Sequence, residues 1–215
     1  MSRRMGSLTL DTLQDLPQQC RTCVFWELSP ECKGANAASE PLLDKEAWVS
    51  GTLLDWGSCG RIAYVDHMPA GYVTYAASKY VPRASQFPTG PPSPDAALLM
   101  TAHVVPTYAH TGLGRLLLRA AAEDLGRRGI RALEVFGDNR DEPGACVAPA
   151  GFFRAVGFKT VAQHRHYPRL RLDLRTLPGW GEGAGALEVE VERWLASVTP
   201  LDALPRTRGE RLTIS

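Results

Sequence analysis

The stretch "AALLMTAHVVPTYAHTGLGRLLLRAAAEDLGRRGIRALEVFG", residues 96–137, contains three structural patterns in succession. Residues 96–105 are almost continuously apolar and end before Pro106, which is typical of a strand buried on both faces. A turn with two glycines follows, and then a run with the spacing of an amphipathic helix that ends at "GRRG". Residues 130–136 form a second apolar run. Strand, helix and strand in such a short span predict a right-handed parallel crossover unit.

Gly112 and Gly114 stand where this helix should begin. A glycine inside a helix costs up to about 1 kcal/mol relative to alanine, so its presence needs a reason. The first N–H groups of a helix are unpaired, and the helix dipole adds a partial positive charge there. Without side chains at these positions, a phosphate can approach the backbone. The glycines therefore indicate either a pyrophosphate site or tight helix–strand packing, and these two residues alone do not separate the alternatives.

Two common phosphate-binding motifs are excluded. A P-loop requires Gly-Lys followed by Ser or Thr, whereas Arg115 and Leu116 follow Gly114. A dinucleotide-binding fingerprint requires a third glycine three residues after the second, where Leu117 stands.

The composition is that of an ordinary globular domain: 215 residues, 44% hydrophobic, 22% charged, with a formal net charge of +1. The sequence has neither a surplus of basic residues nor a stripe of them. Its composition therefore does not indicate binding to nucleic acid or to a membrane surface. No apolar run reaches membrane-spanning length, and no signal-peptide pattern is found. The five cysteines are scattered, which favours a reduced, cytoplasmic protein. The richness in Ala, Gly, Arg and Pro is typical of a bacterial GC-rich genome.

The remaining N-terminal half predicts five features. Residues 8–13 alternate like a short strand, and residues 14–40 form an irregular segment with three cysteines. A helix is expected from Ser39, with an apolar face made of Leu42, Leu43, Trp48, Leu53 and Leu54. Residues 61–78 predict two strands joined by a turn that contains Pro69 and Gly71. The prolines of residues 82–94 predict a loop.

The C-terminal part predicts a short helix closed by Gly157, and then a strand in which Leu170, Leu172 and Leu174 alternate. Residues 186–198 have the pattern of an amphipathic helix that packs on the domain or forms a homodimer contact. We expect one domain over residues 1–178 and an extension over residues 179–215.

The segment "VVPTYAHTGLGRLLL" resembles the acetyl-CoA-binding segment of the GNAT superfamily of N-acetyltransferases. The positions that match the family pattern are Val104, Pro106, Tyr108, Gly112, Leu113 and Gly114. The order of the expected elements also matches, over roughly residues 8–175. The resemblance implies an α/β fold with a mixed, mostly antiparallel sheet, a central pair of parallel strands that splay apart, and flanking helices.

The resemblance further implies direct transfer of the acetyl group of acetyl-CoA to a primary amine. The loop amides would hold the pyrophosphate, and the strand backbone near Val104 and Val105 would pair with the pantetheine arm. The acetyl group would lie where residues 98–105 and 131–136 splay apart. The cofactor-binding residues implied are Val104, Val105, His110, Thr111, Gly112, Leu113, Gly114 and Arg115.

Two positions depart from the family pattern. Ala109 stands where the family has Arg or Gln, and the loss of a charged hydrogen bond is worth about 1.5–3 kcal/mol. Arg115, Arg119 or His110 would have to replace it. Phe153 stands where the family has a Tyr that protonates the departing thiolate, and a phenyl ring has no proton to donate.

Proton transfer would therefore follow another route. The catalytic candidates are Cys146, at a position where relatives have an Asn near the cofactor sulfur, and His103, with Tyr108 as a further candidate. The alternative for Cys146 is a small buried hydrophobe, and for His103 a hydrogen-bonded core histidine.

Two other function classes stay open. Ala109 and Phe153 are compatible with a catalytically silent acyl-CoA sensor or interaction module. The cysteines Cys20, Cys23 and Cys32, with Cys59 and His67 further on, offer a weak zinc-site pattern, because no second CxxC pair follows. The amine acceptor, a small molecule or a protein, is not readable; its pocket is expected from residues 39–60 and 80–95.

Overall fold

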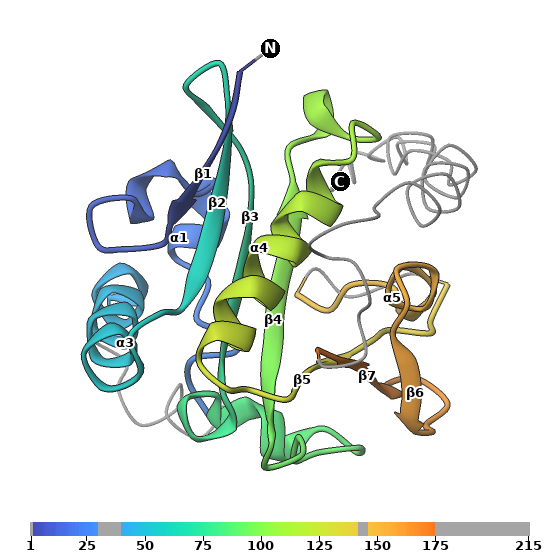
Figure 1. Cartoon of the computed structure of the whole chain (residues 1–215). Coiled ribbons are helices and arrows are strands. Elements are labelled where there is room, and N and C mark those ends of the chain that lie inside the picture. The colour runs from blue at the N-terminus through green and yellow to red at the C-terminus, as the bar shows by residue number, and fades with distance from the viewer. Residues whose placement is uncertain (1, 30–39, 142–145, 175–215) are drawn as a thin grey trace, which may run out of the picture.

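The computed structural model describes residues 2–29, 40–141 and 146–174, which form one mixed sheet with helices on both faces (Figure 1). The sheet order is β1-β2-β3-β4-β5-β7-β6. The strands are β1 (Arg3–Ser7), β2 (Gly60–Val65), β3 (Met68–Ala77), β4 (Ala96–Val104), β5 (Ala132–Phe136), β6 (Lys159–Ala162) and β7 (Arg169–Asp173). The helices are α1 (Gln18–Arg21), α3 (Pro41–Trp56), α4 (Leu113–Arg127) and α5 (Ala150–Ala155), with 3-10 turns η1 (Leu13–Asp15), η2 (Ser78–Tyr80), η3 (Pro82–Gln86) and η4 (Pro106–Tyr108).

The predicted crossover unit is confirmed. Strand β4 pairs in parallel with β5, and α4 connects them across one face of the sheet. The other strand pairs among the described residues are antiparallel. The mixed, mostly antiparallel sheet expected from the sequence is therefore present.

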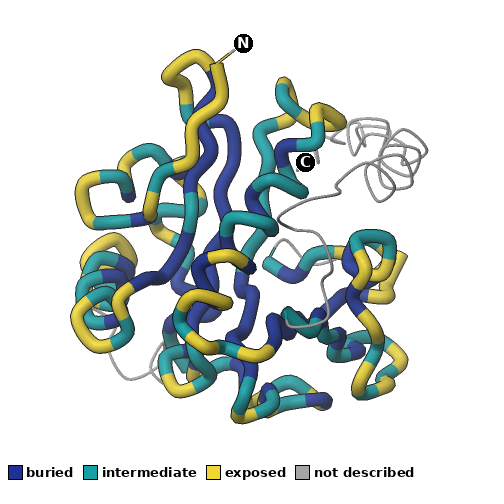
Figure 2. The backbone as a smooth tube through the Cα atoms, viewed as in Figure 1, coloured by how far each residue is buried: buried dark blue, intermediate teal, exposed yellow. Residues whose placement is uncertain are grey.

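The first half of β4 is buried on both faces, as its continuous apolar run predicts (Figure 2). Leu99 packs into the core under α4, together with Leu117 and Leu125. Leu98, which points the other way, packs in the core around Trp26. Strand β4 thus ties the two hydrophobic layers together.

The first strand lies at residues 3–7 rather than at 8–13. Leu8 and Leu13 are almost fully buried, but they pack beneath the sheet from a loop and a 3-10 turn. The true strand, "RRMGS", is a largely exposed edge strand. Its side chains carry almost no apolar periodicity, because an edge strand that faces solvent does not need one.

The turn of the β2–β3 hairpin lies at Asp66 and His67, whose φ angles are +47° and +69°. The predicted turn residues, Pro69 and Gly71, lie inside β3, at an irregularity in its pairing with β2. A side chain at Gly71 would place its Cβ 2.7 Å from the His103 carbonyl oxygen. This glycine therefore serves close strand packing, not a turn.

Helix α3 begins at Pro41 after Glu40, and the predicted cap Ser39 lies outside the described residues. Its predicted apolar face is wrong at three of five positions, whereas Trp48 and Leu53 are partly buried and pack against the core. Leu42, Leu43 and Leu54 are 40%, 57% and 83% exposed. The buried stripe consists of Lys45, Val49 and Thr52. Lys45 and Thr52 are polar, so this stripe does not have the apolar spacing by which a buried helix face is recognised in a sequence. Lys45 is buried because it pairs with the Glu27 carboxylate.

The residues after α4 follow the prediction in part. The short helix α5 and strand β7 lie where expected, and Gly157 has a φ of +99° after α5. The exposed strand β6 was not expected. The proposed helix at 186–198 and the proposed boundary at residue 178 lie outside the described residues. No helix in the described ranges has the length and apolar character needed to cross a membrane.

A buried ion-pair network ties β5 to β7. The Glu134 side chain is fully buried and accepts hydrogen bonds from Arg169 (2.6 Å), Arg171 (3.1 Å) and the Ser93 N–H (3.0 Å). Arg171 also pairs with Asp95 at 2.9 Å. Burial alone would raise the pKa of Glu134, but the hydrogen bonds from Ser93 and the arginine charges outweigh it, so the pKa lies below its usual value. The network stays charged at neutral pH and fixes the base of the β4–β5 pair.

Candidate functional site

Strands β4 and β5 diverge after three paired positions. The pairing runs from Ala96 with Ala132 to Leu98 with Glu134, and β4 then continues to Val104 paired only with β3 (Figure 1). A register shift leaves Met100 as an extra residue between Leu99 and Thr101. Such a bulge bends a strand and increases its twist. The result is a fork between the second half of β4 and the end of β5, which agrees with the splayed pair implied by the family resemblance.

The loop between β4 and α4 presents a row of backbone donors at the fork side of the helix. His110 and Gly112 both have left-handed backbone angles, with φ of +62° and +77°. The N–H groups of residues 110–115 make no hydrogen bond to any described residue. Those that belong to the first turn of α4 carry the positive end of the helix dipole. Thr111 donates its hydroxyl to the Tyr108 carbonyl at 2.7 Å, which fixes the loop.

Arg115 adds a cation to this row of donors. Its Nη2 atom is buried but has no hydrogen-bond partner in the part of the chain that is described. A buried guanidinium nitrogen without an acceptor is costly, and an anionic ligand would satisfy it. Arg119, the other arginine considered as a substitute at Ala109, is paired with Glu123 at 2.8 Å. The geometry therefore favours Arg115 as the replacement.

The two glycines of the loop differ in role. A Cβ at Gly112 would meet no atom within 4 Å, but its φ is one that L side chains rarely adopt. A Cβ at Gly114 would lie 3.7 Å from the Val104 side chain, an ordinary contact. The space in front of Gly112 is thus open, which fits a diphosphate lying against the loop. Val105 is engaged within the protein, because its N–H donates to Ala70 and its carbonyl accepts from Tyr108.

His103 lines a groove of about 280 Å³ on the face of the sheet away from α4. It is the cross-strand partner of Tyr72, so the two side chains share a face. The neighbouring Gly71 faces Leu117 of α4, which places Tyr72 and His103 on the opposite side. Burial lowers the pKa of His103 below its usual value, so the imidazole is neutral at pH 7.

The rest of the groove comes from the irregular segment at residues 14–40, which the sequence did not assign to the acceptor pocket. Its walls include Asp15, Gln18 and Arg21, rather than residues 39–60 or 80–95, where the sequence placed the acceptor pocket. Asp15 accepts a hydrogen bond from the Tyr64 hydroxyl at 2.5 Å, which anchors this wall to β2. Only the folded chain brings residues 15–21 over β3 and β4, so no local pattern could reveal them.

Phe153 is 1% exposed and packs with its edge or face against Phe152 and Phe158. It is a core residue. Cys146 lies elsewhere: its Sγ is 3.5 Å from Cys23 Sγ. The hydrogen bond with Cys23 raises the pKa of the Cys146 thiol, which therefore keeps its proton at neutral pH.

Of the cysteines named as zinc candidates, Cys20, Cys23 and Cys59 fall within the described ranges. Cys20, Cys23, Cys59 and Cys146 are free thiols, and Cys32 lies outside the described residues. Within the described ranges, no group of three or more His, Cys, Asp or Glu side chains could hold a metal ion. Cys59 is buried in the core beneath the sheet, and burial raises its pKa to about 12.

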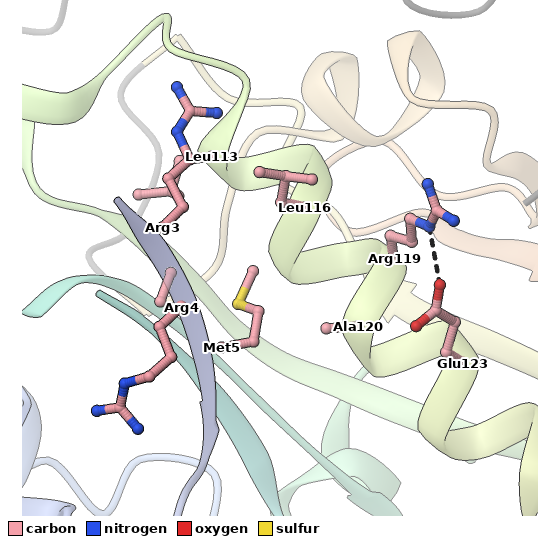
Figure 3. A pocket seen from close by; sticks show the side chains of 9 residues that line it. Arg3, Arg4, Met5, Leu113, Leu116, Arg119, Ala120 and Glu123 are labelled. Atoms are coloured by element: carbon pink, nitrogen blue, oxygen red, sulfur yellow. Dashed lines mark hydrogen bonds and ion pairs between the residues drawn. The ribbon is translucent and has the colours of Figure 1, made fainter. Parts of the chain in front are cut away.

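A second groove, of about 320 Å³, lies between β1 and α4 (Figure 3). Its floor contains Met5 and Leu116, and Arg3 and Arg4 from the edge strand stand at its rim. The Arg119–Glu123 pair on α4 closes one side. This groove is separated from the fork by the body of α4, and none of the sequence-predicted catalytic residues lines it.

No family model matches the sequence, and no curated protein matches it significantly. Solved structures do match. They include the PaiA N-acetyltransferase of Thermoplasma acidophilum in complex with coenzyme A (TM-score 0.53, 16% identity, 80% of this chain and 99% of that chain). An N-acetyltransferase of Staphylococcus aureus Mu50 matches with a TM-score of 0.52 at 12% identity, over 81% and 99% of the two chains. YncA of Salmonella typhimurium, solved with its cofactor acetyl-CoA, matches with a TM-score of 0.54 at 13% identity, over 81% and 95%.

At these identities the likeness is one of fold. The chain spans nearly the full length of each of these structures, and it has the mixed sheet, the forked parallel pair and the glycine loop. The chain therefore adopts the fold of the GNAT superfamily of acetyltransferases.

Proposed function

We propose that this protein binds acetyl-CoA at the β4–α4 loop and the fork, and that it transfers the acetyl group to a primary amine. The observation that carries the proposal is that the N–H groups of residues 110–115 donate to no residue in the described ranges, and that the Nη2 atom of Arg115, in the first turn of α4, is buried without a described partner. A pyrophosphate supplies the acceptors that these donors lack. Two of the structures with the same fold contain coenzyme A or acetyl-CoA, which supports this ligand.

Each part of the site has a separate task in this proposal. Residues 110–115 hold the diphosphate, and the backbone of β4 before Val105 faces the fork. Bound acetyl-CoA supplies an acetyl thioester, which an amine nitrogen can attack. The groove that His103 lines, on the sheet face away from α4, admits the amine. The neutral His103 imidazole accepts the proton that the ammonium form of the amine must lose before it attacks. Cys146 retains a proton that can pass to the departing thiolate.

The proposal is tested by thiol release. Purified, reduced protein is incubated with acetyl-CoA and a panel of small polyamines, amino acids, aminoglycosides and lysine peptides, and free CoA is measured. Release that depends on one class of amine supports the transferase. The second candidate, a silent acyl-CoA sensor, is favoured by Phe153, which fills the core in place of a proton donor. Stabilisation by CoA against heat without turnover on any amine would select the sensor.

Gly112→Val should weaken CoA binding. Valine at a φ of +77° is strained, and the loop relaxes to a form in which its amides no longer converge. We expect the Kd of CoA, measured by calorimetry, to rise by about tenfold or more.

Gly57→Val provides the matched control for this prediction. Gly57 has a φ of +83° and equally open surroundings, but it ends α3. The Gly57→Val variant should lower the free energy of unfolding by an amount similar to Gly112→Val, and it should leave the Kd of CoA unchanged. Equal affinities of the two variants would contradict the role of the loop.

Cys146→Ala should lower kcat by about tenfold with little change in the Kd of acetyl-CoA, because it removes a proton donor but no diphosphate contact. The effect stays below the usual range for a general acid, since the raised pKa makes Cys146 a reluctant donor. Single-turnover kinetics with acetyl-CoA in excess measure it. An unchanged kcat would remove Cys146 from the mechanism.

A further inference from the structure

The thiols of Cys23 and Cys146 meet although 123 positions separate them in the sequence. The two sulfur atoms are 3.5 Å apart, and both residues are partly exposed. A disulfide has an S–S distance of about 2.05 Å, so the atoms need to approach by about 1.5 Å.

Both backbones are held by contacts that involve residues 23–27 and Lys45 of α3. Lys45 Nζ donates to the Cys23 carbonyl at 3.0 Å and forms an ion pair with the buried Glu27. The indole N–H of Trp26 donates to the Cys146 carbonyl, also at 3.0 Å. The Trp26 ring stacks on Phe136, the last residue of β5, with ring centroids 6.2 Å apart. These contacts fix Cys23 and Cys146 relative to each other and to the end of β5.

The pair joins a segment held at the end of β5 to a segment beside the His103 groove. Cys146 follows β5 along the chain, and its carbonyl is held over the β5 end by Trp26. Cys23 follows α1, whose residues Gln18 and Arg21 line the His103 groove. A bond between the two sulfurs would therefore join the groove wall to the β5 side.

The two thiols also differ in reactivity. The hydrogen bond from Cys146 lowers the pKa of Cys23 to about 6, although partial burial opposes this. Cys23 is thus a thiolate at neutral pH, which is the form that attacks oxidants. Cys146 remains a thiol, which can attack the sulfur of an oxidised Cys23 and form a disulfide with it. Cys59 is fully buried, and its pKa is raised, so it should stay inert.

We propose that Cys23 and Cys146 form a redox-active dithiol that hydrogen peroxide converts to a disulfide, and that this disulfide closes the fork. The Cys23 thiolate attacks a peroxide oxygen, the O–O bond breaks, and hydroxide leaves, which gives a Cys23 sulfenic acid. The Cys146 sulfur then attacks the Cys23 sulfur; the S–S bond forms, the S–O bond breaks, and the leaving hydroxide takes the Cys146 proton as water. One thiolate and one thiol are oxidised together by two electrons, and one peroxide is reduced to a water and a hydroxide, which takes a proton from the solvent. A small dithiol such as dithiothreitol reverses the change.

The covalent site is tested by peptide mapping, which does not depend on the proposed function. Full-length protein is treated with hydrogen peroxide, the remaining thiols are alkylated, and the digest is analysed by mass spectrometry. We expect a linked Cys23–Cys146 peptide that disappears after dithiothreitol, while Cys59 stays unmodified in the folded protein. The link should persist in Cys20→Ala and be absent in Cys23→Ser. A Cys20–Cys23 link in the wild type, or sulfonic acid at Cys23 without any link, would overturn the proposal.

The closure of the fork is tested by activity and rests on the proposed function. Peroxide should lower acetyl transfer by about tenfold or more, because small displacements at a reacting centre are costly. Dithiothreitol should restore it. Cys23→Ser should keep its activity under the same peroxide, and Cys20→Ala should lose it as the wild type does. A mapped disulfide without loss of activity would overturn the closure, whereas a reduced protein that neither binds CoA nor turns over would refute the proposed function and leave the dithiol standing.

Discussion

His103→Gln is expected to lower kcat for the best amine of the panel by about a hundredfold. This is the lower end of the range by which loss of a general base usually slows an enzyme. The imidazole lies in the groove opposite α4, beside the fork, and its pKa is lowered by burial. It is therefore neutral at pH 7 and can take a proton from an incoming ammonium group. Glutamine fills similar space but cannot be protonated in this range. The Kd of acetyl-CoA should not change, because His103 is not part of the 110–115 loop.

The pH profile gives this prediction a second readout. In the wild type, activity should fall as the pH drops below 6.5, the ordinary pKa of histidine, with the midpoint below that value. His103→Gln should lack this decline. His67→Asn serves as the control: His67 is exposed in the β2–β3 turn at a φ of +69°, which Asn tolerates. An equal loss of kcat in both variants, or a retained acidic limb in His103→Gln, would exclude His103 as the base.

Glu134→Ala is expected to lower the free energy of unfolding by about 3–5 kcal/mol, because it leaves the partly buried Arg169 without its carboxylate and removes one of the two carboxylates that Arg171 contacts. Glu134 is fully buried and contacts Arg169 and Arg171. Urea denaturation at pH 7 measures the change. Glu123→Ala is the matched control, since it removes an exposed carboxylate from an Arg119 pair and should cost less than about 1 kcal/mol. Similar losses of unfolding free energy in the two variants would contradict the claim that the buried Glu134 ion pairs stabilise the fold more than an exposed pair does.

The contribution of Glu134 also has a defined pH dependence. Its pKa is depressed in the folded protein, so its stabilisation is fully present above the unfolded value of about 4.3 and is lost as the pH falls through the folded pKa. The difference in unfolding free energy between wild type and Glu134→Gln should therefore be largest at neutral pH and shrink below about pH 4. A difference that grows on acidification would show that the carboxylate is protonated in the folded state.

The sequence predicted the central part of the fold because its signals are local and dense. The buried strand at 96–104, the glycine turn and the helix at 113–127 each have a pattern complete within a few residues. The edge strand "RRMGS" could not be found this way, since solvent exposure removes its apolar alternation. The buried stripe of α3 was missed because an ion pair, not an apolar side chain, makes Lys45 suitable for burial.

The sequence pointed to those parts of the candidate site whose signal is local. Glycines at a strand-to-helix turn indicated the loop that we propose binds a diphosphate, and His103 and Cys146 were named as catalytic candidates from their places in the chain. The left-handed angle at His110, the wall formed by residues 15–21, and the contact of Cys146 with Cys23 depend on distant parts of the chain meeting. A single sequence carries no local signal for such contacts.

The central claim is that the unpaired amides at the start of α4 bind the diphosphate of coenzyme A. Titration calorimetry of the reduced wild-type protein with CoA tests it most directly, with Gly112→Val and Gly57→Val titrated alongside. We predict a saturable heat with a Kd well below about 1 mM for the wild type and Gly57→Val, and weaker binding for Gly112→Val. A folded, reduced wild-type protein that gives no binding heat at millimolar CoA would contradict the account.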